Sequence, residues 1–274
     1  MSLQGKTLFI TGASRGIGRE IALRAARDGA NIVIAAKSAE PHPKLAGTIF
    51  SVAAEVEAAG GKALPLQLDV REEKAVQEAM AKAAEHFGGI DALVNNAGAI
   101  KLVGVEQLKP SRFDLMHQIN TRAVLVCSQA ALPWLKQSSN GHILSLSPPL
   151  NLASKWFAQF VPYTVTKYGM SMLTLGMHEE FGKYGISVNS LWPRTIVATA
   201  AIEFEVGGPQ AMKKARTPAI MADAAHAVLS SSGRSISGRL LIDEDVLREQ
   251  GQNDFEQYRV DPAGGPLIPD LYLE

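Results

Sequence analysis

Short apolar runs and amphipathic segments alternate along most of the chain. Between the apolar runs, segments such as 18–29, 47–60 and 74–88 place apolar residues at helical spacing, and each ends in glycine, a common helix stop. Repeated β-α units with nearly continuous apolar strands predict an α/β fold, a single doubly wound domain with a mostly parallel sheet. The predicted strands are 7–11, 31–36, 63–70, 91–97, 142–147, 187–192 and 239–243.

The residues after the last predicted strand differ in composition. Residues 1–243 show no internal boundary, whereas residues 244–274 are rich in proline, glycine and acidic side chains. We interpret 244–274 as an irregular C-terminal arm that belongs to the same domain and packs on it or on a neighbouring subunit. Disorder is the alternative, although Phe255, Tyr258 and Tyr272 give the arm apolar surface to bury.

Composition narrows the class of protein. The chain has 27 basic and 27 acidic side chains, and this balance argues against a nucleic-acid partner, because neutralising many phosphates requires a basic surface. Cys127 has no internal disulfide partner, no apolar stretch is long enough to span a bilayer, and the N-terminus leads directly into a strand-like run. We therefore expect a cytoplasmic protein without a membrane span. The six histidines lack paired metal-ligand spacing, so no metal is expected.

The turn after the first predicted strand, TGASRGIG at residues 11–18, has the features of a phosphate cradle. Gly12 permits a sharp turn, Gly16 lets the backbone approach a phosphate, and Gly18 allows close helix packing. The N-terminus of the following helix supplies amide donors and partial positive charge for a pyrophosphate. An isolated glycine-rich turn can be only a tight turn, but this position between strand and helix favours a dinucleotide site.

The spacing T-G-x-x-x-G-I-G resembles that of the short-chain dehydrogenase/reductase superfamily, whose fold is of the Rossmann type. Asp69-Val70, NNAG at 95–98 and YTVTK at 163–167 follow in the order typical of that superfamily. SPPLN, YTVTKYGMSML and NSLWPRT make the chain most similar to the hydroxysteroid-dehydrogenase-like 2 branch, without a sterol-carrier domain. The resemblance implies a nicotinamide dinucleotide bound by Gly12, Ser14, Arg15, Gly16, Ile17, Gly18, Lys37, Asp69, Val70, Asn95, Ala97, Gly98, Tyr163, Lys167 and Ile196.

The end of the second predicted strand bears on the choice of cofactor. NAD-specific members of the family usually place an acid there, whereas this strand ends Ala35-Ala36-Lys37. Lys37, Arg15 and Ser14 could surround a 2′-phosphate with charge-assisted donors. Each cation alone is an ordinary surface residue, so the missing acid carries more weight. We predict NADP, with NAD less favoured.

Tyr163 and Lys167 are four residues apart, which places them on one face of a helix. A nearby ammonium stabilises phenolate, so Lys167 is expected to lower the pKa of Tyr163 toward the range of general acid–base catalysis. The resemblance implies that Tyr163 exchanges a proton at the substrate oxygen while hydride moves between nicotinamide and carbon. It also implies that Asn120, in MHQINTRAV, helps to hold a water near Lys167. An exposed helix pair is the alternative for an isolated Y-x-x-x-K.

The fifth predicted strand departs from the family pattern. Its carboxyl end commonly carries a Ser-Ser or Gly-Ser pair, but alignment of ILSLSPP puts Pro148 at the usual catalytic position. Ser147 lies one residue earlier, and we predict that a modest backbone shift presents its hydroxyl to the substrate. In the alternative, Ser145 and Ser147 are both structural, and Tyr163 acts with help from Asn120 or water.

These residues together predict an NADP-dependent oxidoreductase that acts on an alcohol or carbonyl substrate, with Tyr163 as acid and base. The substrate is expected to be an apolar small molecule, because apolar residues flank the presumed mouth. Residues 198–217 are expected to cover it as a lid. The resemblance also implies a homodimer or homotetramer. The alternative is a catalytically impaired nucleotide-binding regulatory or interaction protein, which Pro148 favours and the retained Tyr163 and Lys167 oppose.

Overall fold

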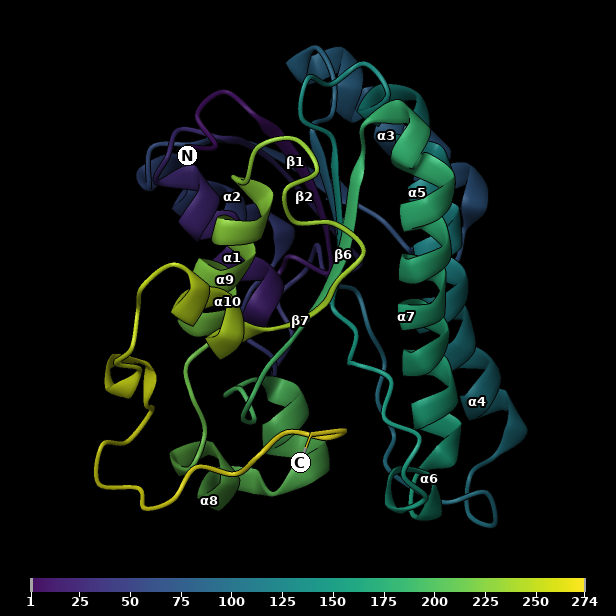
Figure 1. The fold of residues 1–274 in the computed structure, drawn as a ribbon, viewed down its shortest axis with the longest axis vertical. Helices are drawn as coiled ribbons and strands as arrows, with labels where there is room; N and C mark the ends of the chain where they lie inside the picture. The colour runs from purple at the N-terminus through teal and green to yellow at the C-terminus, as the bar shows by residue number, and fades with distance from the viewer. Residues whose placement is uncertain (1, 274) are drawn as a thin grey trace.

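The computed structural model describes residues 2–273 and shows one sheet of seven parallel strands (Figure 1). The strands lie in the order β3-β2-β1-β4-β5-β6-β7, so the direction of the connections reverses between β1 and β4. Strand carboxyl ends beside such a reversal form a crevice in which ligands bind. The bounds are β1 Thr7–Thr11, β2 Asn31–Ala36, β3 Lys62–Gln67, β4 Ala92–Asn95, β5 His142–Ser145, β6 Ser187–Trp192 and β7 Leu240–Ile242.

Helices cover both faces of the sheet, and each face has its own apolar core (Figure 1). This arrangement confirms the predicted single doubly wound domain. One layer consists of α1 (Gly16–Ala26), α2 (Ile49–Ala58), α9 (Ala219–Leu229) and α10 (Asp243–Glu249). The other consists of α3 (Glu73–Phe87), α5 (Ala123–Leu135) and α7 (Val161–Phe181). Shorter helices lie within the connections, namely α4 (Pro110–His117), α6 (Lys155–Ala158) and α8 (Gly208–Lys213).

The end of β5 differs from the sequence prediction in a way that matters for the site. β1, β2 and β6 match their predicted bounds to the residue, but β5 stops at Ser145, two residues early. The Leu146 amide still donates to the Asn95 carbonyl at 3.0 Å, and pairing then ends. Pro148 has no amide for the ladder, so the chain leaves the sheet at this point. Ser147 therefore belongs to the loop at the edge where ligands bind.

The C-terminal arm folds back along the domain toward the carboxyl ends of the strands (Figure 1). It begins as α10 and continues without regular structure apart from a short 3₁₀ turn at Glu256–Tyr258. Phe255, Tyr258 and Tyr272 are buried. Phe255 and Tyr258 belong to the core on the α1 and α9 face. The division of the chain at residue 243 stays a prediction.

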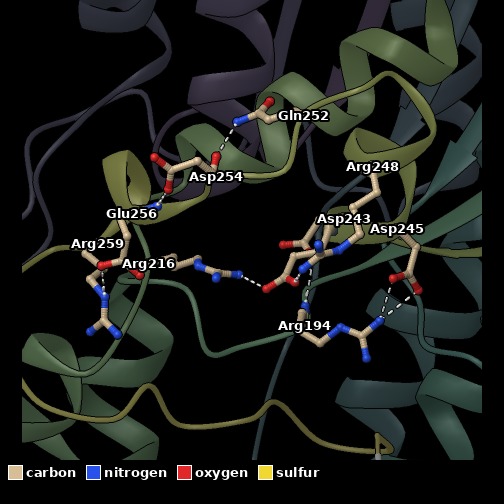
Figure 2. A network of polar contacts seen from close by, with 10 residues as sticks. Arg194, Arg216, Asp243, Asp245, Arg248, Gln252, Asp254, Glu256 and Arg259 are labelled. Atoms are coloured by element: carbon tan, nitrogen blue, oxygen red, sulfur yellow. Dashed lines mark hydrogen bonds and ion pairs between the residues drawn. The ribbon is translucent and has the colours of Figure 1, made fainter.

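Ion pairs connect the start of α10 to the segments that follow β6 (Figure 2). Arg194 donates its backbone amide to Asp243 Oδ1 at 2.8 Å, and its guanidinium to both carboxylate oxygens of Asp245 at 2.7 Å. Arg216 pairs with Glu244, and both side chains are buried. Because buried charges need partners, these contacts fix the backbone around residues 194 and 216.

Two kinds of structural feature are absent from residues 2–273. None of the helices there combines the length and the apolar character that crossing a bilayer requires. No group of three or more histidine, cysteine, aspartate or glutamate side chains in that range is placed to hold a metal ion.

Candidate active site

The glycine-rich turn after β1 is packed tightly against the end of β4. Gly12 has a φ of +67°, and a Cβ on it would lie 2.9 Å from Ala97 Cα. A Cβ on Gly18 would clash with the Asn96 side-chain amide and lie 2.9 Å from the Gly12 carbonyl oxygen. Asn96 Nδ2 donates to the carbonyls of Thr11 and Gly12 at 2.8 and 3.0 Å. Only glycine fits these two positions, as the sequence analysis predicted.

The turn opens into a groove of about 840 Å³ across the carboxyl ends of β1 to β4. A backbone turn that leads into a helix N-terminus, beside a groove of this size, fits a dinucleotide. Ten predicted cofactor residues line the groove: Gly12, Ser14, Arg15, Gly16, Ile17, Lys37, Asp69, Val70, Ala97 and Gly98. Gly18 lies behind the turn, and Asn95 faces β5, where its Nδ2 donates to Ser145 Oγ at 3.4 Å.

The part of the groove beyond β2 carries several cations. Arg15, Lys37 and Lys44 line it. The Arg15 guanidinium donates to the carbonyls of residues 46 and 47 at 3.0 and 2.8 Å, which ties the loop after β2 to the cradle. The Lys37 side chain is 64% exposed, so its ammonium is accessible to a ligand.

Asp69 lies among cations at the same part of the groove. Its carboxylate accepts hydrogen bonds from Arg71 and lies 3.1 Å from Lys37 Nζ. The hydrogen bonds from Arg71 and Lys37 outweigh burial and hold the pKa of Asp69 well below its usual range. Asp69 is therefore ionised, and two basic neighbours balance its charge.

A second cavity, of about 330 Å³, continues from this groove. Ile17, Gly98 and Thr199 border both spaces. The predicted residues in the wall of the second cavity are Ile17, Gly98, Asn120, Tyr163, Lys167 and Ile196. Much of the remaining wall is apolar, formed by Ile100, Leu102, Leu146, Trp192, Ile202 and Val206. Proton-transfer candidates from distant parts of the chain therefore meet beside the groove.

Tyr163 and Lys167 lie one turn apart near the start of α7, and each is 7% exposed. Pro162 occupies the first turn of α7, where a missing amide costs nothing. Lys167 Nζ donates to the Leu146 carbonyl at 2.5 Å and lies 5.1 Å from the centre of the Trp192 ring. The residue after β5 and the last residue of β6 thus hold the ammonium in place from the sheet side.

The protonation of this pair is controlled by burial. Burial lowers the pKa of Lys167 to about 7, although the nearby Asp270 carboxyl acts in the opposite direction. Burial raises the pKa of Tyr163 well above its usual value, and Tyr272 and Asp270 add to the effect. In the arrangement seen here Tyr163 is therefore a neutral phenol. The lowering of this pKa that the sequence led us to expect from Lys167 is not seen, because burial acts in the opposite direction.

Asn120 holds the loop after β4 against α7. It lies in a π-helical turn at Gln118–Arg122 and is fully buried. Its Oδ1 accepts from the Ala99 amide at 2.8 Å, and its Nδ2 donates to the Ala99 carbonyl and to Thr166 Oγ1, both at 2.9 Å. Such single π-helical turns occur frequently at functional sites. Asn120 is thus in the cavity wall but is bound to protein groups.

Ser147 lies outside the walls of both cavities. Its side chain is fully buried, and its hydroxyl has no hydrogen-bond partner within residues 2–273. The carbonyl of Pro148 accepts from Ser171 Oγ at 2.6 Å, which fixes the loop immediately after it. An unpartnered hydroxyl is free to donate to a substrate oxygen, but only after the loop shifts. The role predicted for Ser147 stays a prediction.

Sequence reasoning did not single out three parts of the site. Asn96, rather than Asn95, lines the groove, because it follows the last residue of β4. Lys44 reaches the groove from the insertion after β2. The available signal in the sequence was a basic residue beside a proline in that insertion. Residues 268–271 of the arm line the reaction cavity. The apolar run around Asp270 was a signal for burial, but not for this location.

The backbone of Ile196, a residue that the family resemblance assigned to cofactor binding, is hydrogen-bonded to other parts of the protein. The Ile196 amide donates to the Ile268 carbonyl at 3.0 Å, and the Ile196 carbonyl accepts from the Arg216 amide at 3.0 Å. Both backbone groups of Ile196 are therefore used within the protein. Its side chain remains for the predicted contact with nicotinamide.

A groove for a dinucleotide that leads to a tyrosine–lysine pair is typical of one family of oxidoreductases. The family model described as short chain dehydrogenase matches residues 6–205, and the chain belongs to this family. It is 54% identical over 272 residues to Hydroxysteroid dehydrogenase-like protein 2 of Danio rerio, covering 99% of this chain and 65% of that protein. The chain is therefore a member of the short chain dehydrogenase family that is similar to this branch, and it spans somewhat less than two thirds of the length of this relative.

Solved structures support the same assignment. A protein of Xanthomonas campestris is 54% identical, with a TM-score of 0.96 over all of both chains. A short chain dehydrogenase from Burkholderia cenocepacia, solved with NADP, is 32% identical over 88% of this chain and 97% of its own, with a TM-score of 0.75. Carveol dehydrogenase of Mycobacterium avium, solved with NAD, is 25% identical over 88% and 96%, with a TM-score of 0.72. These two neighbours were thus solved with different nicotinamide dinucleotides, one with NADP and one with NAD.

Proposed function

We propose that the chain is an NADP-dependent oxidoreductase that transfers hydride between nicotinamide and an apolar alcohol or carbonyl substrate, with Tyr163 as the acid and base. The observation that carries this proposal is the position of Tyr163 and Lys167 in a mostly apolar cavity that continues the dinucleotide groove. NADP would supply or accept the hydride. The side chains of the cavity would bind the substrate, exclude water and exchange the proton.

Tyr163 is suited to give a proton to a carbonyl oxygen during reduction. Burial keeps its phenol protonated, and a neutral phenol is the form that an acid requires. The reverse reaction needs phenolate, which positive charge stabilises. Lys167, one helical turn away, would supply that charge together with an oxidised nicotinamide ring. The apolar wall formed by residues such as Leu102 and Ile202 favours an apolar substrate.

The charge distribution at the end of β2 supports NADP over NAD. The strand ends at Ala36 without an acid, and Arg15, Lys37 and Lys44 line the adjoining groove. A 2′-phosphate placed there would accept charge-assisted hydrogen bonds. Asp69 offers little repulsion, because Arg71 and Lys37 balance its charge.

We further propose a homodimer or homotetramer, in which the outer faces of α5 and α7 meet the same helices of another copy. Leu125, Val165, Met172 and Leu175 expose apolar surface on these helices.

A cytoplasmic location is proposed from the single cysteine. Burial raises the pKa of Cys127 to about 12, so its thiol is unreactive.

The proposed function is tested by following NADPH consumption with a panel of aliphatic, aromatic and polycyclic ketones. We expect Tyr163→Phe to lower kcat at least ~100-fold, the usual contribution of a positioned acid, with a much smaller change in the Kd for NADPH, because the groove residues stay in place. Tyr184→Phe, which alters an exposed tyrosine, serves as the control and should keep full activity. Ser147→Ala should lower kcat about tenfold if its hydroxyl donates to the substrate.

The outcomes separate the two candidate functions. Turnover that survives Tyr163→Phe would reject the proposed acid. NADPH binding without turnover of any ketone in the panel would favour a nucleotide-binding regulatory or interaction protein. That second candidate is favoured by one observation, the burial of Ser147 outside the cavity.

A further inference from the structure

The reaction cavity contains a carboxyl group that comes from the C-terminal arm. Asp270 is the one acidic residue in its wall among residues 2–273, and Lys167 is the one basic residue. Tyr163 lies in the same wall, one helical turn from Lys167. A cavity of about 330 Å³ with apolar surroundings screens charge weakly, so a carboxylate here acts on both groups.

The arm holds Asp270 at a fixed place. The Asp270 amide donates to the Arg194 carbonyl at 3.1 Å, and the carboxyl Oδ1 accepts from the Leu271 amide at 2.7 Å. Two residues earlier, the Ile268 carbonyl accepts a hydrogen bond from the Ile196 amide, and the Ile268 amide donates to the Lys214 carbonyl. Arg194 is itself anchored to α10 (Figure 2). Hydrogen bonds therefore hold the Asp270 carboxyl group in a fixed position in the cavity wall.

Aromatic packing anchors the arm on the other side of Asp270. Tyr272 is 1% exposed, and its ring centre lies within 6.4 Å of those of Trp156, Phe160, Tyr168 and Trp192. The Trp192 indole donates to the Leu271 carbonyl at 3.0 Å. Because Trp192 also lies beside Lys167, one cluster connects the arm to the ammonium.

Other charged groups surround Asp270. Burial raises its pKa to about 7, Asp243 at the start of α10 adds to the rise, and Lys167 on α7 opposes it. Asp243 is also raised to a pKa of about 7 by burial, with the Arg216 charge opposing. The Arg194 guanidinium is engaged by Asp245. Tyr163 and Tyr272 are the titratable phenols that face the group.

We propose that Asp270 is a positioning residue for the reaction, because it sets how readily the Tyr163–Lys167 pair loses its first proton. This inference rests on the proposed role of Tyr163 as acid and base. Asp270 acts through the pair and not on the substrate oxygen. The arm, which the family model for residues 6–205 does not include, thereby becomes part of the proton-transfer machinery.

The sign of the effect follows from charge alone. An anion beside the pair favours every protonated form, so the first proton leaves at higher pH while Asp270 is ionised. Asp270 is ionised over the upper part of the pH range in which the pair titrates, so removal of its charge lowers the pH of that first loss, whichever of the two groups releases the proton. In alcohol oxidation the base must be unprotonated, so the acid limb of the kcat/KM profile should shift to lower pH.

The test titrates the protein by NMR with carbon-13 at lysine Cε and tyrosine Cζ, and assigns signals with Lys167→Met and Tyr163→Phe. In Asp270→Asn, which keeps the oxygen that accepts from Leu271, we expect the first proton loss to fall by about one pH unit. Asp270→Ser removes the same charge without the amide and should shift it in the same direction. Asp261→Asn, the same charge change on the arm outside the cavity, should leave it unchanged.

A first proton loss that stays at the same pH in Asp270→Asn and Asp270→Ser would overturn the inference. So would an NMR shift in an active enzyme whose kcat/KM profile does not move in parallel. An NMR shift in a protein that turns over no ketone in the panel rejects the proposed function, and with it the role in the reaction, but keeps the coupling. Normal turnover without an NMR shift rejects only the inference.

Discussion

At the scale of single residues, the sequence predicts the structure best at positions where only one type of residue fits. Gly12 and Gly18 are examples, because a side chain at either would meet backbone or Asn96. Asn95 and Asn96 show the limit of local reasoning. Both stand at the end of an apolar run, but Asn95 is the last residue of β4 and pairs with Ser145 of β5, whereas Asn96 follows the strand and lines the groove. One residue of strand length decides between them.

The Lys37 side chain supports the first prediction at this scale. We expect Lys37→Ala to weaken NADPH binding about tenfold, because one charge-assisted hydrogen bond to a phosphate is lost. NADH binding should change little, since that cofactor lacks the 2′-phosphate. Calorimetric titration with both cofactors measures the ratio, and Lys62→Ala, an exposed lysine at the opposite end of the sheet, is the control. Equal losses for both cofactors would contradict this assignment.

At the scale of elements, hydrophobic periodicity predicts what is held by one sheet or one helix face. The bounds of β1, β2 and β6 follow from their continuous apolar runs. The π-helical turn at Gln118–Arg122 could not be predicted, because one inserted residue leaves no periodic signal. The arm could not be placed either, since Ile268 and Tyr272 bind to partners more than fifty residues away in sequence. Sequence patterns contain no direct record of such contacts.

Tyr272 provides the prediction for the arm. Truncation to alanine would leave a cavity among Trp156, Phe160 and Tyr168, and we expect a loss of about 3 kcal/mol in the free energy of unfolding. Hydrogen exchange should also become faster at residues 266–273. Tyr184→Ala, which truncates a tyrosine that is 40% exposed, should cost less than about 1 kcal/mol. Equal destabilisation by the two substitutions would show that the arm is held by other contacts.

At the scale of the whole molecule, the fold class was predictable because every strand and every packed helix agrees with one α/β arrangement. The cradle and the Tyr163–Lys167 pair were predictable because each is a local motif. The way in which the cavity is enclosed was not predictable, because residues from the loop after β4, the end of β6 and the arm are far apart in sequence and meet only in the folded protein. Asp270 enters the site through this long-range packing.

The outer faces of α5 and α7 support the prediction at this scale. Met172 is 58% exposed, and it lies with Leu125 and Gly176 in a shallow cavity between the two helices. A second copy would bury this apolar surface, so we expect Met172→Glu to place a charge at the contact and convert the protein to monomers. Sedimentation analysis measures the mass of each variant. Leu152→Glu, which changes an apolar residue that is 75% exposed outside α5 and α7, should keep the native assembly. If Met172→Glu leaves the mass of a native oligomer unchanged, or if the native protein is already a monomer, another surface or none mediates association.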